Sequence, residues 1–502
     1  MKQADLEKKI EHFEALKNKR GKIESIWEDI KKYVCPQGDA NTKIYDSTSI
    51  WSKEQLASGL QSLMINRATS WFNLNVITDE EEQDQNQGQG INEWVQNIES
   101  TILDVFNNAE SNFYNQAHQF FLNLAGFGTG IFYIEENLNF PYCVFFKNIS
   151  INECYFDENR FGIVDTIFRL FSMSVKNAAS QWPDSKDLQE KALKDPNETI
   201  EILHMVIENP DSKALPYLSV YVYFEDRVIL SEGDYSYFPF MVTRWLKEEG
   251  EPYGYAPANH VLPDIKLINK LRQLDLQVTE KQLNPPLLVP KTGIGLPLYT
   301  SPGSINYYQN GLMDKVVPLA GMENIRPSME QQNISRDAIL KAFYIDIFRM
   351  GKENKEMTAA EVQYRNEEQM RMMSPIIGRI ETEFLNPLIK AVYKTLAKYK
   401  MIAGLGDGNV MPNIDIEYSS PLSKIQKSSI INSVEQVLGF FQRSGISNLN
   451  PEVYDNLDFD KMFKMFFELR GGPEGILRGD AEVRKVRQQR QMQQQMQQTQ
   501  QM

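Results

Sequence analysis

Apolar residues recur at two different spacings along the chain, and the change between them predicts where helices give way to strands. In the first quarter, spacings of three and four residues predict helices at 7–35, 49–70, 91–108 and 113–128. From 131 to 245, short β-branched and aromatic runs alternate with Asn, Asp, Gly and Pro, which predicts a strand-rich region. One helix, at 176–193, is expected to interrupt these strands.

The most regular stretch follows a turn rich in proline and glycine. Pro263 suits the first turn of a helix. Apolar residues then recur three or four positions apart, at Ile265, Ile268, Leu271, Leu274 and Val278. The sequence Asn-Pro-Pro at 284–286 ends this pattern. We therefore predict a helix of roughly 30 Å over 263–283 that packs through a single apolar stripe.

A second long helix is predicted after an extended segment that is rich in Gly and Pro. The extended segment covers 287–321, and the helix ends near 348. A polar insert at 349–357 follows, and it carries three cations, Arg349, Lys352 and Lys355. Spacing alone favours an ordinary solvated turn between two helices for this insert.

A third long helix is expected to begin with its own cap. Thr358 and Glu361 form a capping box, T-x-x-E, which satisfies backbone N–H groups at a helix start. The pattern then continues to Lys400. Pro375 and Pro387 should each bend this helix, because proline removes a backbone hydrogen bond and clashes with the preceding turn.

The remainder of the chain is again predicted to be helical as far as 480. The last segment, 481–502, is dominated by Gln. Composition does not decide between a projecting helix and a disordered tail there.

Charge and hydropathy limit the class of protein. The net charge of −14 argues against a protein that grips nucleic acid over its whole surface, because phosphate binding needs a dense basic face. A protein past which DNA slides remains possible. No apolar run approaches the roughly 18 residues of a membrane span. The N-terminus is charged and helical rather than a signal or transit peptide, so we expect the chain to stay where it is made.

The residue types that carry catalysis or hold metals are scattered. Three cysteines, at 35, 143 and 154, and four histidines, at 12, 118, 204 and 260, have no metal-ligand spacing. The acidic cluster 79–84 lies in a polar stretch, 78–90, that we interpret as an exposed loop. Metal-dependent catalysis needs carboxylates fixed on rigid elements, so we predict no catalytic centre, no metal and no cofactor.

One glycine cluster, "GFGTG" at 126–130, invites comparison with a phosphate-binding loop. A phosphate cradle follows a strand and opens a helix. Here a helix comes first and a strand second, so the cluster is expected to end a helix and turn into a strand. No G-x-x-x-x-G-K-[ST] pattern is present.

At this point a resemblance enters. The segments "GEPYGYAPANHVLPDIKLINKL" and "NPPLLV" are similar to those of the head-to-tail connector, or portal, proteins of short-tailed, T7-like bacteriophages. Further segments agree in the same order: "IWEDIKKYVCPQGD", "LASGLQSLMINRATSWFNL", "GFGTG", "MTAAEVQYRNEEQMRMMSPIIGRIETEFLNPLI" and "ELRGGPEGILR". The resemblance spans about residues 20–480, and it departs from the family at 78–90 and in the Gln-rich end.

The resemblance implies a mixed α+β, predominantly helical portal fold. Its subunits assemble around a central channel as a closed ring, usually a homododecamer. The implied regions are a wing at 1–255, a stem helix at 256–284, a clip at 285–321, a returning stem helix at 322–348, a channel loop at 349–357, a long kinked wing helix at 358–400, a crown at 401–480 and the tail at 481–502.

The resemblance also implies the function and the partners. The ring would sit at one capsid vertex of the virion, after assembly in the host cytoplasm, and double-stranded DNA would be packaged and later ejected through it. Expected partners are terminase, then tail adaptor and tail proteins, with capsid, scaffolding and internal core proteins, and no membrane. The clip would meet terminase and adaptor through Leu298, Tyr299, Tyr307 and Tyr308.

The cations of the insert gain a role from the resemblance. Arg349, Lys352 and Lys355 are isolated in a polar hairpin between long helices, so we hypothesise that they touch DNA phosphates briefly in the channel. Two other interpretations stay open: a soluble scaffold or adaptor that forms no channel, and a metal-dependent nuclease or another DNA-processing factor. Particle size separates the first from a portal, and Mg²⁺-dependent cleavage would indicate the second.

Overall fold

The structure is a computed structural model, and it describes most of the chain. The described residues are 3–36, 43–68, 70–76, 85–210, 212–283, 287–288, 317–318, 326–348, 359–404, 414–418 and 458–469, with the single positions 434, 436, 439, 483, 486, 487 and 490. The chain divides into two units, one made of Met1–Ser70 and Leu74–Ile416, the other of Trp71–Asn73 and Glu417–Met502. The elements confirm the predicted mixed, predominantly helical class.

Four helices form in the first quarter of the chain, where the apolar spacing predicts them. They are α1 (Gln3–Tyr33), α2 (Thr48–Met64), α3 (Gln85–Asn107) and α4 (Phe113–Phe127). The prediction was wrong at one boundary, because residues 85–90 were expected in a loop and instead begin α3. The polar composition of this segment indicates exposure to solvent but does not exclude a helix, because Gln is a good helix former.

A three-stranded antiparallel sheet follows α4 in the chain. Its strand order is β3 (Val144–Ile149), β2 (Thr129–Glu136) and β9 (Phe240–Arg244). The central residue Ile131 pairs with Ile149 on one side and Val242 on the other. Phe120 of α4 stacks on Phe384 at 4.1 Å between ring centroids, in a buried aromatic core.

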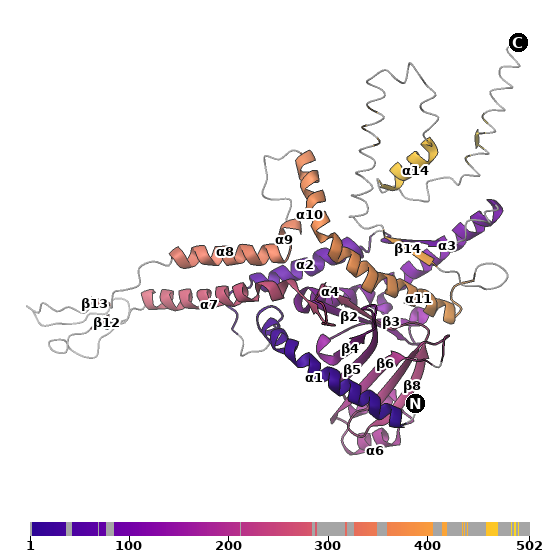
Figure 1. Cartoon of the computed structure of the whole chain (residues 1–502), viewed down its shortest axis with the longest axis horizontal. Coiled ribbons are helices and arrows are strands. Elements are labelled where there is room, and N and C mark those ends of the chain that lie inside the picture. Colours follow the sequence, from indigo (N-terminus) through magenta and orange to yellow (C-terminus); the bar gives the residue numbers. More distant parts are fainter. Residues whose placement is uncertain are drawn as a thin grey trace, which may run out of the picture. The chain divides into compact units, whose positions relative to one another are not determined.

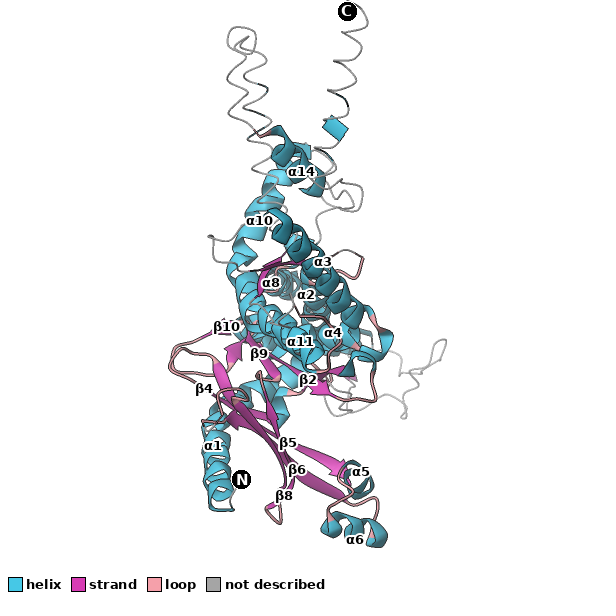
Figure 2. Ribbon diagram, turned by 90° about the vertical axis from the view of Figure 1, so that its right-hand side faces the viewer, coloured by secondary structure: helices cyan, strands magenta, loops and turns pink. Residues whose placement is uncertain are grey.

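A five-stranded antiparallel meander makes up the second sheet. Its strands are β4 (Cys154–Glu158), β5 (Val164–Ser174), β6 (Thr199–Glu208), β7 (Tyr217–Tyr223) and β8 (Val228–Tyr235), in this spatial order. Successive side chains of a strand point to opposite faces. Val220 and Val222 accordingly pack with α1, whereas Tyr223 packs with the helices after β5. Figure 2 shows α1 along one side of this sheet.

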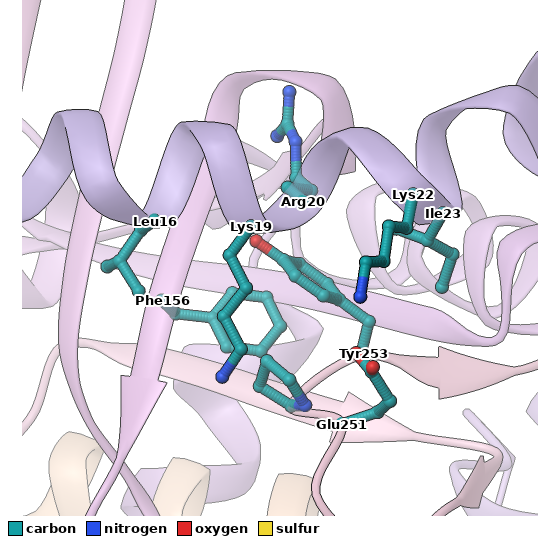
Figure 3. Close-up of a pocket in the computed structure, with 9 residues that line it drawn as sticks. Leu16, Lys19, Arg20, Lys22, Ile23, Phe156, Glu251 and Tyr253 are labelled. Carbon is teal, nitrogen blue, oxygen red and sulfur yellow. The ribbon is translucent and has the colours of Figure 1, made fainter.

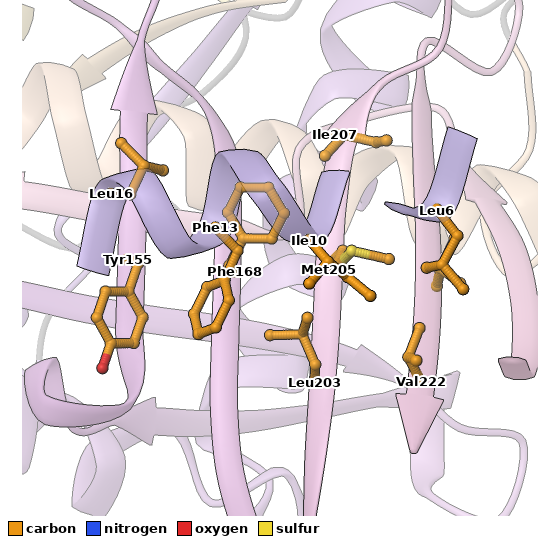
Figure 4. Packing of buried hydrophobic residues seen from close by; sticks show 11 residues of the cluster. Leu6, Ile10, Phe13, Leu16, Tyr155, Phe168, Leu203, Met205, Ile207 and Val222 are labelled. Carbon is orange, nitrogen blue, oxygen red and sulfur yellow. The ribbon is translucent and has the colours of Figure 1, made fainter. Parts of the chain in front are cut away.

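The packing of α1 on this sheet is mainly apolar, and Arg20 adds hydrogen bonds of 2.8 Å to the Cys154 carbonyl and the Tyr155 hydroxyl of β4. Figure 4 shows Leu6, Ile10, Phe13 and Leu16 of α1 aimed at the sheet residues Tyr155, Phe168, Leu203, Met205, Ile207 and Val222. All are buried, so the helical stripe expected over 7–35 is a core stripe.

Two short helices, rather than the single helix predicted at 176–193, cover the other face of this sheet. They are α5 (Val175–Gln181) and α6 (Lys186–Lys194). Pro183 accounts for the break. A proline disfavours helical geometry in the residue before it, and Trp182 ends α5 in a non-helical conformation.

One histidine is enclosed between the sheets. His204 of β6 is fully buried, stacks on Tyr221 at 4.0 Å, and shares a hydrogen bond of 2.9 Å with the Ser219 hydroxyl. Burial, and secondarily the charge of Arg169, lowers its pKa to about 3. The imidazole therefore stays neutral in the folded chain.

The low pKa of His204 makes stability depend on pH. The unfolded chain binds a proton at about pH 6.5, and the folded chain does so only near pH 3, so stability falls as pH falls between these values. From pH 7.5 to pH 5 we expect this residue to cost about 2 kcal/mol. Denaturant titrations at both pH values test this. In His204→Gln the pH-dependent loss should shrink by about that amount, and an unchanged pH dependence would contradict the assignment.

The glycine cluster ends a helix and begins a strand, as predicted. Gly128 adopts a left-handed conformation with φ of 78°, and its N–H donates to the Leu124 carbonyl at 3.0 Å. Strand β2 starts at the next residue. A Cβ on Gly254 would overlap the carbonyl oxygen of Gly128, so both glycines are required for the close approach of the two segments.

The long helices of the second half form with different boundaries. Helix α7 covers Pro257–Leu283, so Pro263 lies inside it and not, as predicted, in its first turn. The returning helix was predicted as continuous, but it breaks into α8 (Arg326–Ala342) and α9 (Ile345–Phe348). Tyr344, with a φ of 56°, makes the break.

The last long helix contains both prolines that were predicted to bend it, Pro375 inside α10 (Ala359–Ile380) and Pro387 at the start of α11 (Asn386–Lys398). A π-helical turn at Glu381–Leu385 joins these two parts, and Figure 1 shows the change of direction along the helix. Pro387 has no N–H to donate to the carbonyl of Glu383. The Asn386 N–H donates instead to Glu381, which closes the wider π turn.

Helix α14 (Phe459–Leu469) belongs to the second unit, and it lies where the sequence predicts a helix. Arg487 pairs with Asp460 through two hydrogen bonds of 2.6 and 2.7 Å. Strand β14 (Ile414–Tyr418) was missed within the part predicted as helical. Its alternation of Ile and Tyr with Asp and Glu is the period-two pattern of a strand.

Candidate assembly interface

Helices α7 and α8 lie side by side and antiparallel, as Figure 1 shows. Asp275 lies opposite Ser328 and Gln332, whereas Asp264, earlier in α7, lies opposite Ser335, later in α8. Beyond the helices, β12 (Leu287–Leu288) pairs antiparallel with β13 (Val317–Pro318). The two helices thus form one hairpin.

Polar side chains line the contact between the two helices. We call Asp264, Asp275, Ser328, Gln332 and Ser335 the polar seam. Ser328 donates to Asp275 at 2.9 Å, Gln332 donates to the same carboxylate, and Ser335 donates to Asp264 at 3.1 Å. Gln332 and Ser335 are almost fully buried, at 2% and 0% exposure. Buried polar groups need such partners, and here they find them across the hairpin.

Large apolar residues of α7 instead remain exposed. With about 100° of rotation per residue, Leu267 and Leu274 lie on one flank of the polar seam, and Leu276 and Leu283 lie on the other. Their exposures are 40%, 41%, 46% and 83%. On α8, Met329 and Ile334 are likewise exposed, one towards each flank. The hairpin therefore has exposed leucines on both flanks, while the buried Ile268 and the half-buried Leu271 and Val278 share the face of α7 that carries the polar seam.

The stripe predicted on α7 divides between these environments. Ile265 and Ile268, near the body of the first unit, are buried. Leu271 and Val278 are half-buried, and Leu274 is exposed. The single chain thus covers only the first part of the stripe.

Three polar contacts brace the base of the hairpin. Lys266 pairs with Asp29 of α1 at 2.5 Å, and the Tyr45 N–H donates to Asn269 at 2.7 Å. Arg336 of α8 pairs with Asp46 at 2.8 Å. Burial acts to raise the pKa of Asp46, but hydrogen bonds from Thr48 and Arg336 outweigh it, so the pKa lies below its ordinary value.

A cluster of charged residues around Arg244 connects the bent helix α10–α11 to both sheets. The guanidinium of Arg244, in β9, pairs with Glu158 of β4 and with Glu383 of the π turn, and the Arg244 backbone N–H also donates to Glu383 at 2.8 Å. Lys247 adds a contact of 2.6 Å to Glu158. Arg244 is 3% exposed, so these pairs are largely shielded from water.

A hollow beside α1 offers no ligand site. Figure 3 shows Leu16, Lys19, Phe156, Glu251 and Tyr253 around it. Its volume of about 10 Å³ suits about one water molecule. In the described part of the chain, no group of three or more His, Cys, Asp or Glu is placed to hold a metal ion.

Several predicted site residues lie outside the described residues. They are Arg349, Lys352 and Lys355 of the insert, Leu298, Tyr299, Tyr307 and Tyr308 of the segment after α7, and the cap residue Thr358. Its partner Glu361 lies in α10, and its side chain is outside the description. These assignments stay predictions.

The polar seam was not predicted from the sequence. Ser328, Gln332 and Ser335 are spaced four and three residues apart, and Asp264 and Asp275 are separated by about three helical turns. Both are helical periods, so a polar stripe on each of two long neighbouring helices was the available indication.

No helix within the described residues is both long and apolar enough to span a bilayer.

Comparison with known proteins identifies the family. The chain is 26% identical to the portal protein of Salmonella phage epsilon15, over 97% of this chain and 91% of that protein. It is 25% identical to a probable portal protein of Bordetella phage BPP-1, over 94% and 89%.

Solved structures with some likeness come from gene transfer agent particles. One belongs to the virion of a native particle, with 10% identity, a TM-score of 0.35 and coverage of 82% of this chain and 88% of that one. Another belongs to the neck of an empty particle, with 10% identity, a TM-score of 0.36 and coverage of 84% and 92%. We draw nothing from these two likenesses, because the TM-scores are low.

The family match itself covers nearly the whole chain. Residues 6–477 match the family described as "Bacteriophage head to tail connecting protein", which confirms the resemblance found in the sequence. The chain therefore belongs to the bacteriophage head-to-tail connecting proteins, the structural portal components of phage virions.

Proposed function

We propose that copies of this chain close a ring at one capsid vertex, and that the phage genome enters and leaves the head through the channel of this ring. The observation that carries the proposal is the α7–α8 hairpin, whose exposed apolar residues lie on two flanks. A ring requires each subunit to contact two neighbours through two different surfaces. A hairpin with two apolar flanks supplies both surfaces.

In this proposal the hairpin is the stem of the ring. Helix α7 is the stem helix and α8 with α9 is the returning stem helix. The segment 285–321 is the clip, 349–357 is the channel loop, 401–480 is the crown and 481–502 is the tail. The pairing of β12 with β13, which brings residues 287–288 beside residues 317–318, supports the clip assignment.

The partners follow from the same proposal. The clip binds terminase during packaging and the tail adaptor afterwards, through Leu298, Tyr299, Tyr307 and Tyr308. Capsid, scaffolding, internal core and tail proteins meet other surfaces. The net charge of −14 supports a channel that DNA slides through, because an acidic wall repels phosphate.

Genome packaging tests the proposed function directly. Phage particles are assembled in cells with this chain and with its gene interrupted, and the DNA protected from nuclease inside purified heads is measured. We expect heads made without the chain to hold no protected genome, and supplying the chain from a plasmid to restore it. Full heads in the absence of the chain would contradict the proposal.

The channel-loop cations are expected to act on DNA and not on assembly. Replacing Arg349, Lys352 and Lys355 together with Ala removes three positive charges from the insert. Because each phosphate contact contributes a salt-dependent attraction, we expect altered packaging or genome retention, with rings of normal mass. Protected DNA and retention on storage are compared with those of wild type. Unchanged values for both would refute the hypothesis.

A further inference from the structure

The polar seam continues past the hairpin into the body of the first unit. Arg336 donates to Gln332 at 3.3 Å and to Asp46 at 2.8 Å, and Asp46 also accepts from the Thr48 N–H at 3.0 Å. One unbroken chain of hydrogen bonds therefore runs from Ser328 through Asp275, Gln332, Arg336 and Asp46 to the start of α2.

A chain of hydrogen bonds constrains the relative position of two helices more closely than an apolar contact does. Apolar side chains tolerate small slides and rotations, whereas hydrogen bonds work only within narrow limits of distance and angle. A buried polar group leaves its partner unsatisfied when the register changes, and single buried polar residues are known to fix register between helices. Gln332, at 2% exposure, is such a group.

Ring closure needs this kind of precision. A ring of about twelve copies turns by about 30° per subunit, and one more copy changes that angle by only about 2°. The two apolar flanks of the hairpin belong to both helices. A small rotation of α8 against α7 therefore changes the angle between the flanks, and with it the number of copies that closes.

We propose that the polar seam, together with Arg336 and Asp46, fixes the rotation of α8 against α7 and thereby selects one copy number for the ring. This inference rests on the proposed function, because it presupposes that the flanks meet neighbouring copies. The seam residues are positioning residues: they set the geometry of the apolar flanks without touching the neighbour.

The test replaces both partners of the seam by apolar side chains. Exchanging a buried hydrogen-bonded pair for apolar groups of similar shape is often neutral for stability, so Asp275→Leu with Gln332→Leu is expected to fold with a melting temperature close to that of wild type. Native mass spectrometry of the assembled full-length chain then counts copies per ring. We expect rings of the wild-type mass to make up about half of the particles or less. A change of about 2° in the angle between neighbouring subunits is enough to change the copy number.

Matched variants separate positioning from other effects. Glu280→Leu with Glu330→Leu likewise replaces two polar side chains by Leu, at exposed positions of the same helices, and should keep a single mass. Asp275→Asn keeps one oxygen to accept from Gln332, while its amide N–H can donate to the Ser328 hydroxyl, so this variant should also keep a single mass. If the double Leu variant does not fold, Gln332→Met, similar in length, is expected to broaden the masses instead.

The outcomes distinguish a failure of this inference from a failure of the proposed function. The inference is overturned if the folded double Leu variant keeps the single wild-type copy number, and the proposed function then stays intact. Where Gln332→Met replaces that variant, the same result in Gln332→Met has the same meaning. A wild-type chain that forms no ring overturns the proposed function itself. A lowered melting temperature with an unchanged copy number assigns the seam to stability alone and also overturns the inference.

Discussion

The variant Leu267→Glu with Leu274→Glu is expected to fold as a subunit and to form no ring. Both residues are exposed in the single chain, at 40% and 41%, so the subunit does not need them for its own core. In the proposed ring they would lie against a neighbour, where each unpaired carboxylate costs on the order of 3 kcal/mol. Circular dichroism and native mass together test both parts of the expectation.

The two flanks allow a sharper form of this experiment. Leu276→Glu with Leu283→Glu disables the other flank, so each double variant keeps one working surface. Because contacts in the proposed ring join one flank to the other, a mixture of the two variants should form heterodimers and stop there. Leu193→Glu, on an exposed leucine of α6, is the control and should assemble normally. Rings of normal mass from either double variant would contradict the assignment of the flanks.

The second large effect is expected inside the subunit, at the cluster around Arg244. Arg244→Met leaves Glu383 without its guanidinium partner and Glu158 with Lys247 alone, and both carboxylates are mostly shielded, at 19% and 16% exposure. Removing one partner of a buried ion pair costs about 3 to 5 kcal/mol. We expect a loss of about 3 kcal/mol in the free energy of unfolding, measured by denaturant titration.

A neighbouring lysine supplies the comparison. Lys247→Met removes a more exposed cation, and Glu158 keeps Arg244 as a partner, so the loss should be clearly smaller. Equal losses in the two variants would show that the charge of Arg244 has no special role. An unchanged stability in Arg244→Met would contradict the burial of the cluster.

Helix ends were predictable where the chain contains an unambiguous terminator. Helix α7 ends at Leu283, directly before the sequence Asn-Pro-Pro that predicts its end, and Gly128 ends α4 in a left-handed conformation. The start of α7 was mispredicted because Pro257 and Pro263 both suit a first turn. Local sequence does not distinguish a proline that begins a helix from one that a longer helix tolerates near its start.

The polar seam could not be inferred in the same way. A polar stripe on one helix resembles a solvated face, and Asp275 and Gln332 are far apart in the chain. Their roles exist only after the hairpin brings them into contact. The apolar stripe was visible in the sequence, but its division into buried Ile268 and exposed Leu274 depends on where the body of the first unit ends.

The copy number of the purified full-length chain tests the central claim most directly. Native mass spectrometry, with end-on electron micrographs of the same sample, reports both mass and shape. About twelve copies of the 58.0 kDa chain predict about 0.7 MDa and rings with a central hole. A chain that stays a monomer or dimer at high concentration, even with scaffolding protein present, would contradict the claim that the two flanks of the α7–α8 hairpin build a ring.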